Sequence, residues 1–393
     1  MRTNYLLFFL FALLMLGCKR KEPLSLVQTD NPVFIENTAF SSFEDLSSPK
    51  FKALKEKYQL DTVFHGEEDE FTRMLLLRDW IKKTIRISDF EESYPGDEYA
   101  ENILDAALKG HGFHCGHYMI VQNAVMNSYG YVTRCLGAGP GVKGGPDGHH
   151  GINEIWSNKF QKWFLSDAKY NHHFEKNASQ PALRTTSGGG PDGQGIPLSA
   201  LEIRDEYLKN KAADVVLVKG VHRIPIEYDS LLNIKGEIIR ITKERFAQTY
   251  TWIEWEKSNN RFTVWPDTAH ELGKLNMYAD DYFRNNIWIW DKKPHWAYNT
   301  EFMILVEDRN AIEWTPNTIK ADVKIEGDVA SISLSSNTPN LKAYQIKESP
   351  VGEWMDISNP VMMTLKKDKN ELAFRSLNLT GIPGTEYKVI IGR

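Results

Sequence analysis

The sequence predicts an α+β protein with an antiparallel sheet, followed by a β-rich region and a small C-terminal β-sandwich. Apolar residues recur at helical spacing through much of 47–128. From Tyr131 the spacing changes to the period of two that strands show. Beyond Thr318, short alternating runs follow one another about every ten residues and are separated by turn sequences. Helices followed by consecutive strands are typical of an α+β layer.

The N-terminus has the features of an export signal. Arg2 supplies a positive charge, 5–16 is an apolar run too short to span a bilayer, and Gly17-Cys18 follows. The stretch LLMLGCKRK resembles a bacterial lipoprotein signal, in which cleavage precedes the cysteine and that cysteine is acylated. We therefore expect a signal over 1–18, lipidation at Cys18, and a lipid-anchored protein of the bacterial cell envelope, in the periplasm or at the cell surface. An ordinary secretory peptide cut nearby is the alternative.

Charge and loop composition argue against nucleic acid and nucleotide partners. The net charge is −5, and basic residues are interspersed with acidic ones. The glycine-rich sequence GGPDG occurs twice, at 144–148 and 189–193, without the Gly-Lys-Ser/Thr of a phosphate-binding loop. No cofactor and no metal are expected.

The first domain is predicted over 46–195, after a polar tether over 19–45. Helices are expected over 71–85, 101–110 and about 115–128, the last closed by Tyr129-Gly130. In the first helix, the apolar stripe leaves Arg78 largely on the polar side. Three strands are then expected, with the sequences YVTRCLGAG, INEIW and KWFLSDAKY.

A β-rich aromatic middle region is predicted over 196–317, and an immunoglobulin-like β-sandwich over 318–393. The middle region begins with a helix over 198–213 and continues with strand-like runs at 215–220, 250–256, 261–265, 285–290 and 301–307. Its tryptophans are Trp252, Trp255, Trp265, Trp288, Trp290 and Trp296. On alternating strands most of them are expected in the core, whereas exposed rings would form a platform for sugars or peptides.

Three residues have the chemistry of a nucleophilic site. Cys115 stands at a helix start, where the helix dipole and a nearby imidazolium lower the pKa of a thiol. His150 opens a strand and Asp167 ends the next one. If these strands form a hairpin, the carboxylate orients the imidazole and the imidazole serves the thiol.

Two blocks around these residues resemble the transglutaminase-like superfamily, which has a papain-like Cys-His-Asp core. They are GFHCGHYMIVQNAVMNSYGYVTRCLGAG and HHGINEIWSNKFQKWFLSDAKY, and the resemblance covers roughly 75–170. It implies that Cys115 is the nucleophile, His150 the general base and acid, and Asp167 its orienter. Glu154 matches a glutamate that is expected to be structural.

The resemblance implies a cysteine enzyme that acts on peptide or amide bonds through a thioester, more as a hydrolase than as a cross-linker. Its substrate would be a peptide or protein, with cell-wall peptide or glycan among the candidates. Two non-enzymatic alternatives stay open. One is a surface lipoprotein that binds a glycan or peptide with the same fold, and the other is a scaffold whose β-sandwich docks a partner.

The same residues allow two other interpretations, a disulfide and a zinc site. A disulfide between Cys115 and Cys135 is disfavoured because a helix start and the following strand are expected to lie too far apart, which leaves Cys135 as a buried apolar residue. Zinc is disfavoured although seven histidines lie within 111–173 of this domain, namely His111, His114, His117, His149, His150, His172 and His173. Neighbouring histidines on a strand point to opposite faces, and no zinc motif is present. His149 could replace His150 as the base, and His172 and His173 are expected in a solvated loop.

Overall fold

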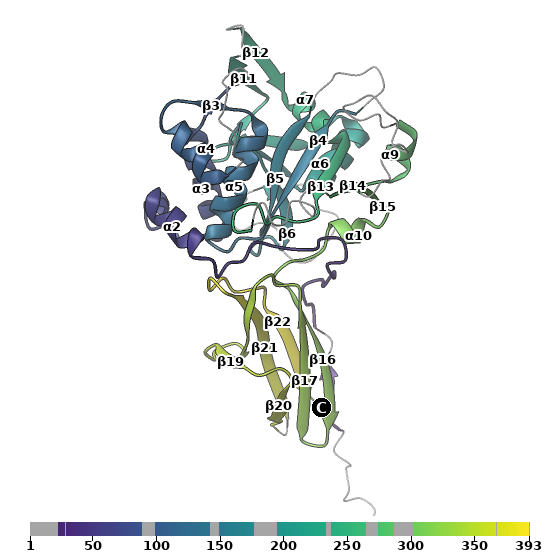
Figure 1. Ribbon diagram of the computed structural model, residues 1–393. Coiled ribbons are helices and arrows are strands. Elements are labelled where there is room, and N and C mark those ends of the chain that lie inside the picture. The colour runs from purple at the N-terminus through teal and green to yellow at the C-terminus, as the bar shows by residue number, and fades with distance from the viewer. Residues whose placement is uncertain are drawn as a thin grey trace, which may run out of the picture.

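The chain forms an α+β fold with a large lobe of helices and sheet and a narrower lobe of strands (Figure 1). The computed structural model describes residues 23–27, 29–88, 99–141, 149–176, 195–232, 237–264, 274–286, 302–366 and 368–392. Among these residues, no helix is both long and apolar enough to cross a membrane.

Helices cover one side of the large lobe, and the first residue of one of them belongs to the candidate site. They are α2 (Pro49–Lys57), the 3-10 helix η1 (Leu60–Phe64), α3 (Glu70–Thr84), α4 (Ala100–Ala107) and α5 (Cys115–Ser128), with a short parallel pair of strands β2 (Arg86–Ile87) and β3 (Gly112–Phe113) beside them. Side chains cap several of these helices, as where Asp69 accepts the N–H of Thr72 at the start of α3. The central helix α5 is buried along most of its length, which fixes its first residue against the sheet.

A six-stranded sheet forms the centre of the large lobe, in the order β15-β14-β13-β4-β5-β6. Its strands are β4 (Thr133–Gly139), β5 (His150–Ser157), β6 (Lys162–Ser166), β13 (Trp252–Glu256), β14 (Leu275–Tyr278) and β15 (Met303–Val306). All neighbours are antiparallel except β14 and β15. The three strands predicted after the helices are therefore β4, β5 and β6, adjacent in the sheet.

Strands of the middle region pair with strands that come before residue 195 in the chain. β13 pairs with β4, with Trp252 opposite Gly139 and Trp255 opposite Leu136. Both tryptophans are buried. The sequence pattern indicated a strand here, but its partner lies more than a hundred residues away, and alternation alone does not specify long-range pairing.

The remaining elements of the large lobe flank this sheet. A four-stranded sheet has the order β10-β9-β7-β8 and contains β7 (His172–Lys176), β8 (Ile196–Pro197), β9 (Val215–Lys219) and β10 (Ile224–Ile226). The hairpin of β11 (Tyr228–Leu232) and β12 (Ile238–Thr242) projects from the top of the lobe (Figure 1). The helical segments are α6 (Ala200–Asn210), α7 (Lys243–Gln248), η3 (Thr249–Thr251), α9 (Asp281–Asn286) and α10 (Arg309–Ile312).

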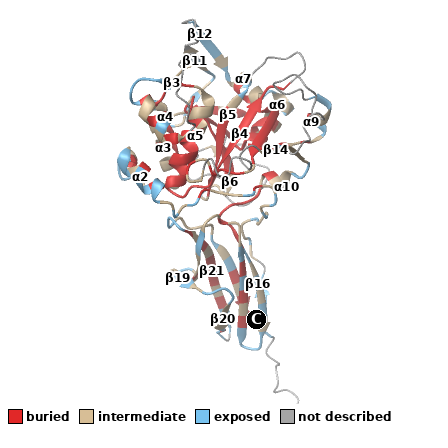
Figure 2. Cartoon of the chain, in the orientation of Figure 1, coloured by how far each residue is buried: buried red, intermediate tan, exposed pale blue. Residues whose placement is uncertain are grey.

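The narrow lobe consists of two sheets around a separate apolar core. One sheet contains β16 (Ile319–Glu326), β17 (Val329–Ser336) and β20 (Val361–Thr364). The other has the order β1-β22-β21-β18-β19, with β1 (Ser25–Val27), β22 (Tyr387–Gly392), β21 (Lys369–Asn378), β18 (Leu341–Glu348) and β19 (Met355–Ile357). Ile332, Phe374 and Ile391 are fully buried between them. Figure 2 shows the broader buried region in the centre of the large lobe.

The segment predicted as a tether is part of the fold from residue 23 onward. β1 pairs with β22 in the narrow lobe, and Phe40 packs in the core of the large lobe. Glu44 is buried and accepts the main-chain N–H groups of Phe262 and Thr263. These partners lie over two hundred residues away, so the aperiodic sequence of the segment gave no local sign of them.

Other expectations for the middle region are wrong or lie outside the described residues. Residues 261–264 form bends, and 285–286 end α9, so neither belongs to a strand. Trp265, Trp288, Trp290 and Trp296 and both GGPDG loops lie outside the described residues. Since Trp252 and Trp255 are buried, they belong to the core and not to an exposed platform.

Candidate active site

Cys115 is the first residue of α5, and its thiol is only partly exposed. The preceding His114 caps the helix, because its Nδ1 accepts the N–H of Gly116 at 3.2 Å. The facing strand comes very close at this point. A Cβ added to Gly151 would lie 3.2 Å from the Cα of Gly116, so only glycine lets β5 approach the helix start so closely.

His150 and Asp167 meet at one end of the hairpin formed by β5 and β6. Nε2 of His150 lies 2.7 Å from Oδ2 of Asp167. The other carboxylate oxygen accepts the N–H of Tyr170 at 3.1 Å, and the main chain of Asp167 exchanges hydrogen bonds with that of His172. Because Asp167 occupies Nε2, the imidazole presents Nδ1 to the thiol. The structure thus brings together all three residues that the sequence singled out.

The three groups stabilise one another's charged forms. Burial raises the pKa of the Cys115 thiol, but hydrogen bonds from His114 and His150, the charge of His150 and the N–H of Gly151 outweigh it and lower that pKa to about 4. Burial lowers the pKa of His150, and the charges of Asp167 and Cys115 reverse this and raise it to about 9. The pKa of Asp167 is raised by burial but held well below its usual range by His150. Both shifts favour a thiolate–imidazolium pair at neutral pH.

The sequence did not predict that polar side chains near Asp167 are buried. Arg78 lies in α3 and is completely buried, where its guanidinium donates to Oδ1 of Asn171 and to the carbonyl oxygen of His172. His172 and His173 are also completely buried, not in a solvated loop. In a helical sequence pattern, an arginine is normally assigned to the solvent side. Only the tertiary structure shows that carbonyl and amide oxygens accept hydrogen bonds from this guanidinium.

His172 contacts the triad without taking part in its main hydrogen bond. Its Nε2 lies 3.4 Å from Oδ2 of Asp167, and its ring stacks on Tyr170 and meets Phe246 edge-on. Burial lowers the pKa of His172 to about 4, with the charge of Asp167 opposing this effect. The lowered pKa favours a neutral ring at neutral pH, and this ring packs against Tyr170 and Phe246 beside the carboxylate.

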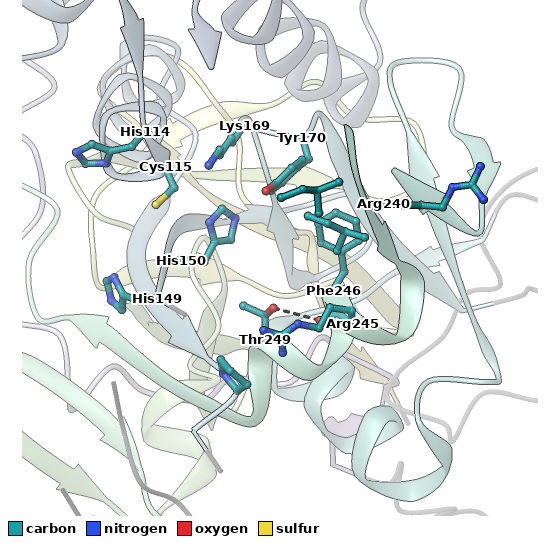
Figure 3. Close-up of a pocket in the computed structure, with 13 residues that line it drawn as sticks. His114, Cys115, His149, His150, Lys169, Tyr170, Arg240, Arg245, Phe246 and Thr249 are labelled. Atoms are coloured by element: carbon teal, nitrogen blue, oxygen red, sulfur yellow. Dashed lines mark hydrogen bonds between the residues drawn. The ribbon is translucent and has the colours of Figure 1, made fainter. Parts of the chain in front are cut away.

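The thiol and imidazole open onto a cavity of about 430 Å³ (Figure 3). Its lining comprises His114, Cys115, Pro140, His149, His150, Lys169, Tyr170, Ile239, Arg240, Ile241, Arg245, Phe246 and Thr249. The wall from residue 239 to 249 comes from the hairpin strand β12, from α7 and from the start of η3. The sequence did not predict that residues 239 to 249 line the site, because they lie about a hundred residues beyond the triad in the chain.

His149 and Glu154, which the sequence also singled out, take no part in the contact between His150 and Asp167. Nε2 of His149 lies 3.3 Å from Oε1 of Glu254, and it is His150 that contacts Asp167. Glu154 is fully buried and accepts from Arg134, Trp255 and the N–H of Ala200, which is a structural arrangement.

Neither a disulfide nor a metal cluster occurs among the described residues. Cys115 and Cys135 are both free thiols, and Cys135 is buried in β4 with its Sγ 3.5 Å from Nδ2 of Asn153. Within the ranges that the structure covers, no group of three or more His, Cys, Asp or Glu side chains is arranged to hold a metal ion.

Comparisons with known proteins give little beyond this geometry. No protein-family model matches the chain, and a search of curated proteins gives no significant match. Among solved structures, the chain is similar to red sea bream transglutaminase at 10% sequence identity, over 80% of this chain and 68% of that one, with a TM-score of 0.25.

Proposed function

We propose that the protein is a cysteine hydrolase of peptide or amide bonds with a transglutaminase-like, papain-like catalytic core. The observation that carries this proposal is the order thiol, imidazole, carboxylate at the mouth of a cavity, with Nε2 of His150 2.7 Å from Asp167. Such a set activates a thiol and also protonates a leaving group. The roles proposed are nucleophile for Cys115, acid and base for His150, and orienter for Asp167.

The proposed reaction has two steps, the formation of a thioester and its hydrolysis. The Cys115 thiolate adds to the amide carbonyl, the C–N bond breaks, and the His150 imidazolium gives its proton to the departing amine, which leaves a thioester. His150 then takes a proton from water, the hydroxide adds to the thioester, and the C–S bond breaks to release the acid and restore the thiolate. The main-chain N–H of Cys115, at the start of α5, is the proposed donor to the oxyanion.

A mixture of synthetic peptides tests the proposal. Incubation with the full chain, followed by mass spectrometry, should show cleaved peptides and a transient acyl adduct on the peptide containing Cys115. Cys115→Ser should abolish both, whereas Cys135→Ala, which removes the thiol buried in β4, should retain them. Added amine should be incorporated only as a minor product if hydrolysis dominates. Intact peptides and no adduct with a folded wild-type chain would contradict the proposal.

We further propose that Cys18 carries the lipid that anchors the protein in the cell envelope. The support is the LLMLGCKRK sequence, since residues 1–22 lie outside the described residues. Labelling of cells with an alkyne fatty acid should mark the wild-type chain, and Cys18→Ala should lose the label and appear in the soluble fraction. A labelled Cys18→Ala chain would place the lipid elsewhere.

A further inference from the structure

We infer that the cavity selects acyl donors that carry a carboxylate near the scissile bond, and that Arg245 binds this carboxylate. This inference rests on the proposed function, because it assigns a substrate class to the same cavity. The class is an acidic peptide, in which a glutamate or aspartate side chain lies close to the carbonyl that Cys115 attacks.

The charge of the cavity lining favours an anion. None of the thirteen described lining residues is Asp or Glu, whereas Lys169, Arg240 and Arg245 carry positive charge. Two carboxylates in contact with lining residues are already engaged, because Asp167 holds His150 and Glu254 contacts His149. Apart from the Cys115–His150 pair, the charged side chains of the lining are therefore cationic, and such a lining attracts ligands of negative charge.

Arg245 is the group best suited to bind a carboxylate. Its side chain is half-buried, and NH1 donates to the neutral Oε1 of Gln248 at 2.9 Å. In the part of the chain that the structure describes, no carboxylate lies within ion-pair distance of this guanidinium. Burial lowers the pKa of Arg245, as expected for a cation that has lost water without gaining an anion.

Other arginines of the same lobe have guanidinium groups that are paired with carboxylates. Arg204 makes two hydrogen bonds to Asp280, and Arg309 contacts both Asp205 and Glu313. The guanidinium fork matches the two oxygens of a carboxylate in this way. Among the described residues Arg245 has no such carboxylate partner, and a substrate carboxylate would supply one.

The position of Arg245 differs from that of Arg240, the other arginine of the lining. In Figure 3, Arg245 lies with Thr249 on the side of the pocket formed by α7 and η3, while Arg240 points away from Cys115 and His150. The Arg240 guanidinium instead lies over the ring of Tyr228, 3.9 Å from its centroid. Tyr170 and Phe246 also line the cavity, where they would hold the apolar part of the substrate.

Two chloroacetyl reagents of equal size test the inference without a known substrate. They are chloroacetyl-glutamate N-methylamide and chloroacetyl-glutamine N-methylamide, and the rate of Cys115 alkylation at pH 6.5 is followed by peptide mass spectrometry. We expect the glutamate reagent to react about tenfold faster, the ratio that a hydrogen bond to a charged group typically gives. Arg245→Gln should remove this preference, and Arg245→Lys should retain part of it.

Arg240→Gln is the matched control, since it removes one positive charge from the same wall at a side chain that points away. It should keep the preference, and a thermal melt confirms that each variant is folded. Equal rates for the two reagents in the wild type, a preference that survives in Arg245→Gln, or an equal loss in Arg240→Gln would each overturn the inference. Slow alkylation of Cys115 by both reagents would instead contradict the proposed function itself.

Discussion

At the scale of single residues, the reactivity of Cys115 depends on the ring of His150. Without that ring, the thiol loses a hydrogen bond and the nearby positive charge that offset its burial. We predict that His150→Ala lowers the rate of iodoacetamide alkylation at pH 6 more than tenfold, because the thiol pKa returns toward its ordinary value of about 8.5. His149→Ala, one residue earlier, should alkylate at the wild-type rate. Equal effects of the two substitutions would contradict a specific role of the His150 ring in activating the thiol.

Sequence reasoning at this scale identified the reacting groups but not their support. Cys115, His150 and Asp167 belong to short motifs whose chemistry is visible in the residue types and their order. Arg78 and His172 were assigned to solvent because charged and polar side chains are normally exposed. Their burial depends on partners from other elements, such as the carbonyl oxygen of His172 for Arg78, and no local pattern contains that information.

At the scale of elements, the contact between α5 and β5 sets the spacing of thiol and imidazole. Gly151→Ala would place a Cβ 3.2 Å from the Cα of Gly116 and 3.6 Å from Sδ of Met119. We predict that it slows Cys115 alkylation and lowers the free energy of unfolding by about 1–3 kcal/mol, the usual cost of overpacking. In Gly392→Ala the added Cβ makes only ordinary contacts, at 3.7 Å or more, so both quantities should stay at wild-type values. Wild-type reactivity in Gly151→Ala would show that the helix start tolerates displacement.

A buried ion pair between β4 and β5 of the central sheet also connects to α6 and to β13. Arg134 contacts Glu154, which also accepts from Ala200 at the start of α6 and from the indole of Trp255. We predict that Arg134→Met lowers the free energy of unfolding by about 3–5 kcal/mol, because it leaves a buried carboxylate without its cation. Chemical denaturation measures this value. Arg134→Met combined with Glu154→Gln should lose less than the two single losses added together, and simple additivity would contradict this coupling.

The sequence predicted element types better than element partners. The helix expected over about 115–128 is α5 itself, because its apolar content and closing glycine are local signals. The strand at β13 was also expected, but its place beside β4 was not. Strand pairing over a hundred residues depends on the packing of the whole lobe, which neither periodicity nor turn chemistry describes.

At the scale of the whole molecule, the two lobes are joined by buried hydrogen bonds. Asn378 of β21 donates to the carbonyl oxygen of Gly130, just after α5, and its Oδ1 accepts from Thr380 and Ile382. We predict that Asn378→Ala lowers the free energy of unfolding by about 1–3 kcal/mol, since it leaves a buried carbonyl without its donor. The melting curve should remain a single transition, because β1 and the residues after it also connect the lobes. Two separate transitions in the wild type would show that the lobes unfold independently.

The pH dependence of Cys115 alkylation tests the central claim most directly. The thiol pKa is lowered to about 4, so the thiolate persists as the pH falls to that value, and the raised pKa of His150 keeps the imidazolium up to about pH 9. The account predicts that the iodoacetamide rate at Cys115, followed by peptide mass spectrometry, is half-maximal near pH 4 and already at its plateau at pH 6. A rate that is negligible at pH 6 and half-maximal near pH 8.5, the behaviour of an isolated thiol, would contradict it.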